Sequence, residues 1–384
     1  MFVSAKNLLN FLIFLFVDFF LGLRKIIKHS KSLLILRLDS IGDYILFRNF
    51  LTAINVDDKY KDFRITLCGN VIWKELAEKL DSDVIDEFIW LDRIKFLNSL
   101  SYKISFLKTI YSKGFGIVIN STYTRELLFG DQIVKSSRAV ERIGNSGSPD
   151  KIRKVRFFSD RFYTKLFESS NKSLFEFNRN LEFFELLLNK KLNVVRPEIN
   201  YSKLPGYNGL PVKYCVVFPG SNDVKRRWNA ASYAEICEYL ISELGFQVVI
   251  PLAAGEKYIA DEIMNKVKSD KLIDLSGKCS LTELAAVIAE SEIVISNDTA
   301  AVHISAAVNK RFLCISNGSY FGRFLPYPET IFSKANYIFP GEIMKDFETS
   351  EKLASKYWLK SPLDINAVTV EKVKEKIKGI LGDK

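Results

Sequence analysis

The stretch "SEIVISNDTAAVHISAAV" (residues 291–308) decides the fold class of this chain. A short apolar run ends at Asn297 and Asp298, and a segment rich in alanine and valine follows Thr299. Short apolar runs bounded by polar residues are typical of buried strands, and the longer segment behind this one suits a buried helix. The stretch therefore predicts a strand that leads into a helix through a polar turn.

The same alternation fills the second half of the chain. Apolar runs that predict strands lie at 214–220, 246–255, 271–277, 291–297 and 311–318. Helical segments separate them, at 230–244, 256–268, 281–290 and 299–308. Ser280 and Glu283 have the S-x-x-E spacing of a capping box at the start of one of these helices. Strands that alternate with such helices predict a parallel sheet with helices on both faces.

The first half repeats this pattern less regularly, with strands expected at 32–38, 63–69, 84–91 and 115–121. We therefore expect an α/β chain of two Rossmann-like domains, whose parallel sheets face each other across a cleft. The expected divisions are a first domain at 32–195, a Pro/Gly-rich linker at 196–211, a second domain at 212–345, and a helical segment at 346–384 that packs back on the first domain.

The N-terminal segment, residues 1–31, differs in kind from the rest. Phe and Leu dominate residues 8–23, but polar residues interrupt the run, so it is a poor candidate for a membrane-spanning helix or a cleaved signal peptide. On a helix the polar residues share a narrow arc, made by Asn7, Asn10, Asp18, Lys25 and Lys28. This pattern predicts an amphipathic helix that lies in a membrane interface. The alternatives are a helix docked on the protein's own surface or in a dimer, and a single-pass anchor.

The composition narrows the class of partner. The chain has 384 residues, a formal net charge of +10 and five scattered cysteines without C-x-x-C or zinc spacing. The cysteine pattern indicates a reducing compartment. The positive charge favours anionic partners such as nucleotide phosphates or acidic lipids.

Polar residues gather where the predicted strands end. In "RLDSIGDYI" (37–45), Gly42 allows a tight turn, and Asp43 is placed to act as a general base or simply to cap the following helix. In "PGSNDVKRRWN" (219–229), Lys225, Arg226 and Arg227 suit a diphosphate, although a solvated run of charges has the same spacing.

Two further strand ends add candidates. Glu256 in "LAAGEKY" (252–258) is placed either to bind ribose hydroxyls or to sit favourably at a helix N-terminus. Asp298 and Thr299 begin the helix that carries His303 four residues later, on nearly the same face. A histidine in such a helix is ordinarily a core residue, but four polar strand ends around one cleft favour a ligand site.

These segments together resemble glycosyltransferase family 9, the lipopolysaccharide heptosyltransferase family. The resemblance covers roughly 33–320 and is strongest at 33–55 and 214–308. It implies a GT-B fold, with the donor sugar nucleotide held mainly by the second domain and the acceptor by the first. It also implies an inverting reaction that uses neither a metal nor another cofactor.

The resemblance assigns roles to single residues. Asp43, in the motif S-x-G-D with Ser40 and Gly42 on the acceptor side, corresponds to the catalytic base. Arg226 takes the place of the lysine in the family's K-x-W motif beside the donor diphosphate, with Lys225 and Arg227 adjacent. Asp298, Thr299 and His303 match the donor-binding motif D-S/T-G-x-x-H. Here Ala300 replaces the glycine, which is compatible with a helical backbone but not with a positive φ.

The acceptor side has one further candidate, the basic and aromatic stretch 135–165. Arg153, Lys154 and Arg156 are its candidates for contacting a phosphorylated glycolipid. A solvated loop has the same composition, and nucleic acid is a competing partner, but no recognised nucleic-acid motif accompanies the stretch. The acids in "DSD" (81–83) match a metal-binding D-x-D pattern, but they are ordinary turn formers at this position.

The sequence thus predicts a glycosyltransferase that moves a sugar, heptose from ADP-heptose by the resemblance, to a lipopolysaccharide core or related surface glycolipid. The expected location is cytoplasmic, with peripheral attachment to the inner face of the cytoplasmic membrane. The alternatives are another enzyme on the same fold, such as a sugar-nucleotide epimerase, and a non-catalytic scaffold that binds nucleotide sugars.

Overall fold

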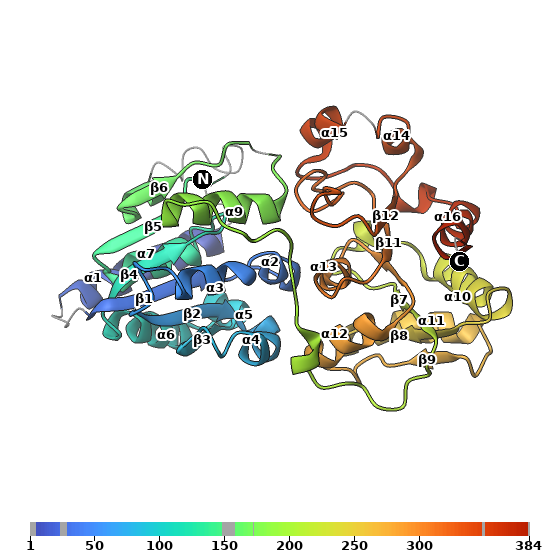
Figure 1. Ribbon diagram of the computed structural model, residues 1–384. Helices are drawn as coiled ribbons and strands as arrows, with labels where there is room; N and C mark the ends of the chain where they lie inside the picture. The colour runs from blue at the N-terminus through green and yellow to red at the C-terminus, as the bar shows by residue number, and fades with distance from the viewer. Residues whose placement is uncertain (1–4, 24–28, 148–157, 172, 348–349, 383–384) are drawn as a thin grey trace. The chain divides into compact units, whose positions relative to one another are not determined.

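The computed structural model describes residues 5–23, 29–147, 158–171, 173–347 and 350–382. The chain divides into two compact units, which are described separately. Unit 1 comprises residues 1–172 and 178–194, and unit 2 comprises residues 173–177 and 195–384. Each unit contains a parallel sheet with helices packed against it (Figure 1).

Within the described residues, the sheet of unit 1 has six parallel strands in the order β3-β2-β1-β4-β5-β6. The strands are β1 (His29–Arg37), β2 (Arg64–Asn70), β3 (Glu87–Leu91), β4 (Phe115–Asn120), β5 (Glu141–Asn145) and β6 (Lys165–Phe167). The helices are α1 (Ala5–Gly22), α2 (Ile41–Ile45), α3 (Asn49–Asn55), α4 (Lys74–Leu80), α5 (Arg93–Asn98), α6 (Leu100–Ser112), α7 (Gly130–Ser137) and most of α9 (Glu176–Leu188). The strands predicted in this half are confirmed, whereas β5 and β6 were not predicted.

The described part of unit 2 repeats this plan, with six parallel strands in the order β12-β11-β10-β7-β8-β9. The strands are β7 (Tyr214–Phe218), β8 (Gln247–Ile250), β9 (Leu272–Asp274), β10 (Val294–Asn297), β11 (Phe312–Ile315) and β12 (Ala335–Ile338). The helices are α10 (Ala230–Ser242), α11 (Lys257–Lys266), α12 (Leu281–Glu290), α13 (Ala300–Ala307), α14 (Gly341–Met344), α15 (Ser350–Tyr357) and α16 (Val370–Gly382). The strand and helix expected in the stretch 291–308 are confirmed, as is the capping box of Ser280 and Glu283 on α12.

Both sheets have the Rossmann strand order, in which the direction of strand succession reverses beside the first strand. The reversal falls between β1 and β4 in unit 1, and between β7 and β10 in unit 2. Neighbouring helices leave a crevice at such a point, at the carboxyl ends of the strands, and ligands of this fold class bind there. The topology therefore directs attention to the loops after β1, β4, β7 and β10.

The segment predicted as a linker, residues 196–211, lies within unit 2. Ile199 and Leu204 are buried, and the backbone N–H of Ile199 donates to the carbonyl of Ala307 over 2.9 Å. The segment is thus held against unit 2 at Ile199 and Leu204, while most of its other residues are exposed or partly exposed.

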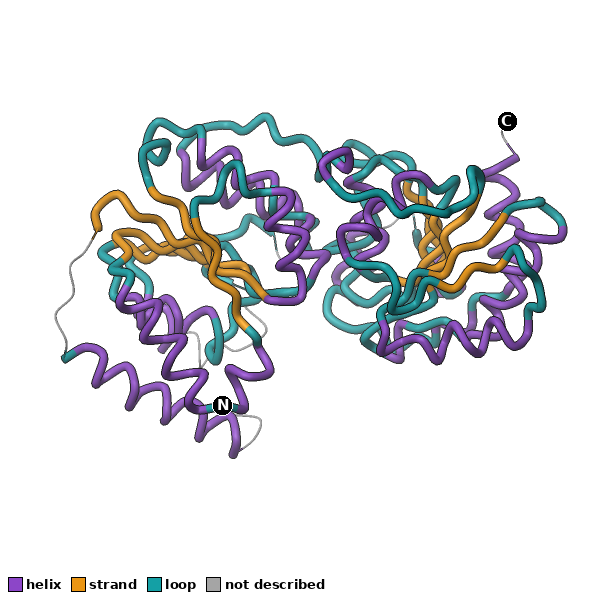
Figure 2. The backbone as a smooth tube through the Cα atoms, turned by 90° about the horizontal axis from the view of Figure 1, so that it is seen from below, coloured by secondary structure: helices purple, strands orange, loops and turns teal. Residues whose placement is uncertain are grey.

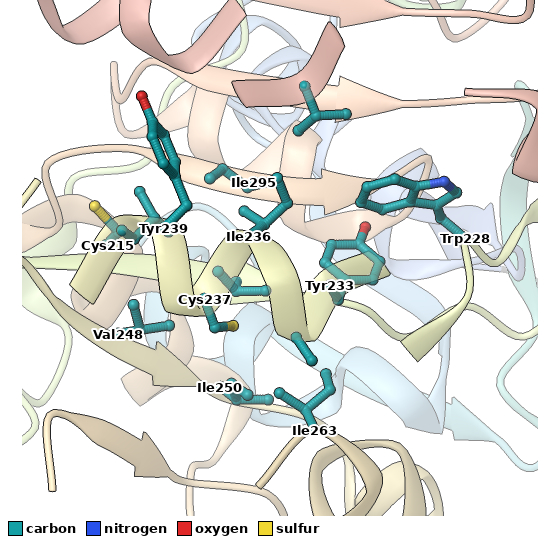
Figure 3. Close-up of a cluster of buried hydrophobic side chains, with 14 of the residues drawn as sticks. Cys215, Trp228, Tyr233, Ile236, Cys237, Tyr239, Val248, Ile250, Ile263 and Ile295 are labelled. Carbon is teal, nitrogen blue, oxygen red and sulfur yellow. The ribbon is translucent and has the colours of Figure 1, made fainter. Parts of the chain in front are cut away.

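The C-terminal helix corrects a prediction. The segment 346–384 was expected to pack back on the first domain, but α16 packs against α10 of unit 2. Val370, Val373 and Ile377 belong to the same buried cluster as Trp228 and the apolar face of α10. Figure 3 shows Trp228 and the α10 side chains Tyr233 and Ile236 of this cluster. The amphipathic pattern of α16 predicted a buried face, but such a pattern does not specify the partner.

Replacement of Ile377 by alanine tests this packing. Because Ile377 is fully buried, the variant should lower the free energy of unfolding of unit 2 by about 2–5 kcal/mol. Native-state hydrogen exchange at the α10 amides measures this loss separately from unit 1. Lys378→Ala, at the exposed neighbouring position, is the matched control, and equal protection in both variants would contradict the placement of α16.

Candidate functional site

The polar residues of unit 2 converge because β10, β7 and β8 are neighbours in the sheet. Parallel strands present their carboxyl ends at one edge, so the loops that follow these three strands lie together. They carry every residue predicted to bind the donor: Lys225, Arg226, Arg227, Glu256, Asp298, Thr299, Ala300 and His303.

Asn297, the last residue of β10, holds two of these loops in place. Its buried side-chain Oδ1 accepts hydrogen bonds from the backbone N–H of Trp228 at 3.1 Å and from the Tyr233 hydroxyl at 3.0 Å. Its Nδ2 donates to the carbonyls of Pro219 at 2.7 Å and Gly220 at 3.1 Å. The end of β10 is thereby fixed to both ends of the loop that carries the three cations.

The three consecutive cations have different surroundings. Arg226 Nη1 lies 3.3 Å from Asp298 Oδ2, and Arg227 Nη2 donates to the Ser221 carbonyl over 2.6 Å. Arg227 also contacts the Tyr258 hydroxyl and lies 3.9 Å from Glu256 Oε1. Lys225 is exposed, and its ammonium has no partner within the described part of the chain.

Two guanidinium nitrogens in this loop lack a hydrogen-bond acceptor within the described part of the chain. Among the described residues, the buried Nε atoms of Arg226 and Arg227 have no hydrogen-bond partner. A buried donor without a partner costs free energy, which an anionic acceptor such as a phosphate oxygen offsets. Of the two interpretations of this loop, these buried donors favour a diphosphate site over a solvated run of charges.

Glu256 approaches the same loop closely. A Cβ added at Gly220 would lie 2.5 Å from Glu256 Oε2, so the carboxylate needs glycine at position 220. Glu256 also precedes α11 as its N-cap residue, although its side chain makes no capping hydrogen bond. The carboxylate is thus held beside the cation loop, and the structure leaves both predicted roles open.

The motif at the start of α13 is largely buried. Burial raises the pKa of the Asp298 carboxyl, and the Arg226 guanidinium opposes that rise. The Thr299 hydroxyl caps the helix by accepting from the N–H of Ala301 over 3.3 Å. Ala300 is the first helical residue and is not among the residues with positive φ, so its methyl group is compatible with the backbone.

His303 is a buried residue held by the fold. Its Nδ1 lies 2.7 Å from the Tyr327 hydroxyl, and only 4% of its surface is exposed. Burial lowers its pKa to about 3, and the nearby Arg226 charge adds to that effect. The imidazole is therefore neutral at physiological pH, and this geometry favours a role in positioning α13 over direct contact with a donor.

In unit 1, Asp43 lies next to a buried arginine that sequence analysis missed. Arg37, at the end of β1, is fully buried, and its Nη2 is 3.7 Å from Asp43 Oδ1. The same guanidinium contacts Asp39 Oδ1 at 2.9 Å and donates to Asn180 Oδ1 over 3.1 Å. The only signal in the sequence was the position of Arg37 at the end of a predicted strand. A single arginine that follows an apolar run has no distinctive spacing, so the sequence did not single it out.

Asp43 also forms a capping box with Ser40 at the start of α2. The Ser40 N–H donates to Asp43 Oδ2 over 3.2 Å, and Gly42 is buried within the same helix. The capping role considered from the sequence is therefore present. The Asp43 side chain is 14% exposed, which leaves its carboxylate accessible to a substrate proton.

A small cavity of about 40 Å³ lies nearby, at the carboxyl ends of β1 and β4. Arg93 and Arg125 line it, and both follow predicted strands without having been singled out. Arg93 donates to the carbonyl of Leu38 over 2.9 Å and to Glu126 over 2.6 Å. Arg125 pairs with Asp160 at 2.6 Å. The acceptor candidates Arg153, Lys154 and Arg156 lie outside the described residues.

The D-x-D pattern at 81–83 has a local explanation. The buried Asp81 carboxylate accepts hydrogen bonds from the Tyr44 hydroxyl at 2.5 Å and from Arg48 at 2.6 Å. These contacts tie α2 to the end of α4. They account for an acid at position 81 without a metal.

Comparisons with known proteins identify similar families and folds. Residues 165–336 match the model of Glycosyltransferase family 9 (heptosyltransferase). Lipooligosaccharide heptosyltransferase 2 of Haemophilus influenzae is 30% identical over 93 residues, which cover 23% of this chain and 27% of that protein. Lipopolysaccharide heptosyltransferase 2 of Escherichia coli is 28% identical over 93 residues, covering 23% and 26%. The aligned segments thus span about a quarter of these relatives.

Solved structures extend the likeness to nearly the whole fold. E. coli heptosyltransferase WaaC with ADP has a TM-score of 0.70 at 14% identity, and the match covers 91% of this chain and 99% of that one. A glycosyl transferase family 9 protein from Veillonella parvula has a TM-score of 0.67 at 19% identity, covering 92% and 98%.

Two parallel sheets of Rossmann order together with these structural neighbours define a GT-B fold. The predicted resemblance to glycosyltransferase family 9 is confirmed, with residues 165–336 carrying the family match.

The buried histidine gives the stability of unit 2 a specific pH dependence. Since the pKa of His303 falls from 6.5 to about 3 on folding, the unfolded chain binds more protons between these values. The histidine's contribution to stability is therefore complete above pH 6.5 and is lost as the pH falls. Between pH 7 and pH 5 this loss amounts to about 2 kcal/mol.

His303→Gln, which keeps a polar group for Tyr327, should remove this dependence. Urea unfolding of unit 2 at pH 7 and pH 5 measures it in the variant and the native protein. The decisive quantity is the difference between the two pH values, because it is independent of any general destabilisation by the substitution. An equal loss in both proteins would show that His303 is accessible to protons in the folded state.

Proposed function

We propose that this protein is an inverting, metal-independent glycosyltransferase that transfers heptose from ADP-heptose to a lipopolysaccharide core or related glycolipid. The observation that carries the proposal is the cation loop at the carboxyl ends of β7, β8 and β10, with its unpartnered Arg226 and Arg227 Nε atoms. This loop lies inside the segment that matches glycosyltransferase family 9 (heptosyltransferase). The relatives named above supply the sugar and the class of acceptor.

The fold alone does not distinguish glycosyl transfer from epimerisation of a nucleotide sugar. A putative UDP-N-acetylglucosamine 2-epimerase from Listeria monocytogenes has a TM-score of 0.51 to this chain at 10% identity. The family match and the curated relatives, all heptosyltransferases by name, favour transfer over epimerisation.

Under this proposal the donor diphosphate occupies the loop after β7. Arg226, Arg227 and Lys225 surround its phosphates, and the N–H groups at the start of α13 face the same charge. Negative charge grows on the diphosphate as the bond to the sugar breaks. Cations held in place before the reaction stabilise this charge without reorganising, which is the role that a metal takes in other sites.

The acceptor is activated in unit 1. Asp43 accepts the proton of an acceptor hydroxyl, whose oxygen attacks the anomeric carbon while the nucleoside diphosphate leaves from the opposite face. One such displacement inverts the configuration at that carbon. The buried Arg37 guanidinium, 3.7 Å from Asp43 Oδ1, orients the carboxylate. Arg93, which is partly exposed, is suited to bind a phosphate group of the acceptor. Such an acceptor places the enzyme at the cytoplasmic face of the membrane.

Asp43→Asn tests the proposed base. The amide keeps the shape of the side chain but cannot take the proton, so the transfer rate should fall by about 10²–10⁴-fold. Donor binding, measured by calorimetry with ADP, should remain unchanged because the donor residues lie in unit 2. Asp62→Asn, at an exposed carboxylate of the same unit, should transfer at the native rate. Transfer by Asp43→Asn within threefold of the native rate would reject the role.

A thermal-shift panel of ADP, UDP, GDP and CMP with their sugar conjugates tests the donor. A ligand present at 100 times its dissociation constant adds about 2.7 kcal/mol to stability. ADP and ADP-heptose should raise the unfolding temperature of unit 2 more than the other nucleotides. A preference for uridine or guanosine nucleotides would replace the donor and keep the glycosyltransferase. A lack of response to all of them would favour the scaffold.

A further inference from the structure

Helix α1 is docked on unit 1 through an apolar stripe that also carries two buried polar residues. Asn10 and Asp18, which belong to the polar arc found in the sequence, are both buried. Asn10 Oδ1 accepts from Lys103 Nζ over 3.1 Å, while Asp18 pairs with Arg138 at 2.8 Å and Lys135 at 3.5 Å. These partners come from α6, from α7 and from the residue that follows α7. Asn10 and Asp18 thus face the protein and not the solvent.

The outward side of α1 is consequently apolar. Phe16, Phe19 and Leu23 are each more than 60% exposed. Further exposed side chains on the same helix are Leu8, Leu9, Leu12 and Phe20. The inward side is largely apolar too, since Phe14, Val17 and Leu21 are buried in the core of unit 1. A helix on the surface of a water-soluble protein normally has a polar outward side instead. Contiguous exposed apolar surface of this kind marks an interaction site.

The apolar surface continues onto the neighbouring helices of unit 1. α1 contacts α6 and α7 and forms an outer layer over them (Figure 2). Leu100 and Ile104 of α6 are exposed beside it, and Ile94 of α5 is 75% exposed. A groove of about 710 Å³ is lined by residues of α1 and α6, all of them apolar except Lys108.

Charge distinguishes between the candidate occupants of this surface. The sequence next to α1 carries Arg24, Lys25, Lys28 and Lys31, and it has no acidic residue between Asp18 and Asp39. A second copy of the chain would bring these cations together, whereas anionic lipid headgroups neutralise them. No described helix is long and apolar enough to cross a bilayer. An apolar face beside cations is the arrangement of a helix that lies in the membrane interface.

We infer that the outward face of α1, with Leu100 and Ile104, docks unit 1 on a bilayer that contains anionic phospholipid. The groove between α1 and α6 takes an acyl chain, and Lys108 binds the phosphate of that lipid. The hydrogen bonds of Asn10 and Asp18 fix the helix to the protein, so the membrane holds unit 1 in one orientation. The inference rests on the proposed function only in explaining why the protein would bind a membrane. Lipid binding itself is measured without donor or acceptor.

Vesicle sedimentation of the full chain tests the inference. The native protein should bind vesicles of phosphatidylethanolamine and phosphatidylglycerol, and bind vesicles of phosphatidylcholine alone at least tenfold more weakly. Phe16→Ser with Phe20→Ser should lower binding to the anionic vesicles by about tenfold or more, because two exposed aromatic rings no longer enter the bilayer. Lys108→Glu should weaken binding to anionic vesicles only.

The matched control is Val212→Ser, which removes a fully exposed apolar side chain of unit 2 and should bind vesicles as the native protein does. The unfolding temperature and its shift with ADP should be unchanged in every variant, which separates loss of lipid binding from failure of the donor site. Native binding to both vesicle types alike, or undiminished binding of the Phe16 and Phe20 variant, would overturn the inference. So would lipid-free dimerisation that this variant abolishes, since a second copy would then cover the face.

Discussion

The side-chain amide of Asn297 is the interaction on which the site in unit 2 depends. It makes four hydrogen bonds at the end of a buried strand, which use both donors and both acceptor positions of the amide. One partner is the N–H of Trp228, whose indole lies in the core and donates to the carbonyl of Val368, just ahead of α16. The amide therefore links the hydrophobic core of unit 2 to the loop that carries the cations.

Buried charge at strand ends is the second constraint. Arg37 and Asp298 are removed from water, and their ionic partners are Asp39 and Asp43 for Arg37 and Arg226 for Asp298. Taking such charges out of water costs several kcal/mol per ion, and apolar side chains of similar volume commonly give a more stable core. Arg37 and Asp298 lie at the sheet edge where this fold binds ligands. Their burial is better explained by a role in ligand binding or catalysis than by a gain in stability.

Sequence reasoning succeeded where local pattern and tertiary environment agree. The central strands β7, β8 and β10 are buried on both faces, so each appears as a short apolar run, and the polar residues predicted at their ends lie at neighbouring strand ends. The edge strands β6 and β12 are only partly buried, and they lacked that run. Arg93 and Arg125 were missed because a single arginine after a strand carries no distinctive spacing. For α1 and α16, periodicity identified a polar and an apolar face of each helix. It did not identify the part of the protein against which each helix packs.

Under the proposed function and the inferred membrane attachment, the orientation of α1 would let one chain serve a soluble donor and a membrane-bound acceptor. The exposed apolar face and the Asp43, Arg93 and Arg125 side chains all belong to unit 1, whereas the cation loop belongs to unit 2. A nucleotide sugar diffuses in water, so unit 2 needs no affinity for lipid. A glycolipid acceptor stays in the bilayer, and a unit held there meets it at a high local concentration. Because Asn10 and Asp18 fix α1 to α6 and α7, the inferred attachment would also set the direction in which the acceptor-side loops face, which a flexible anchor would leave open.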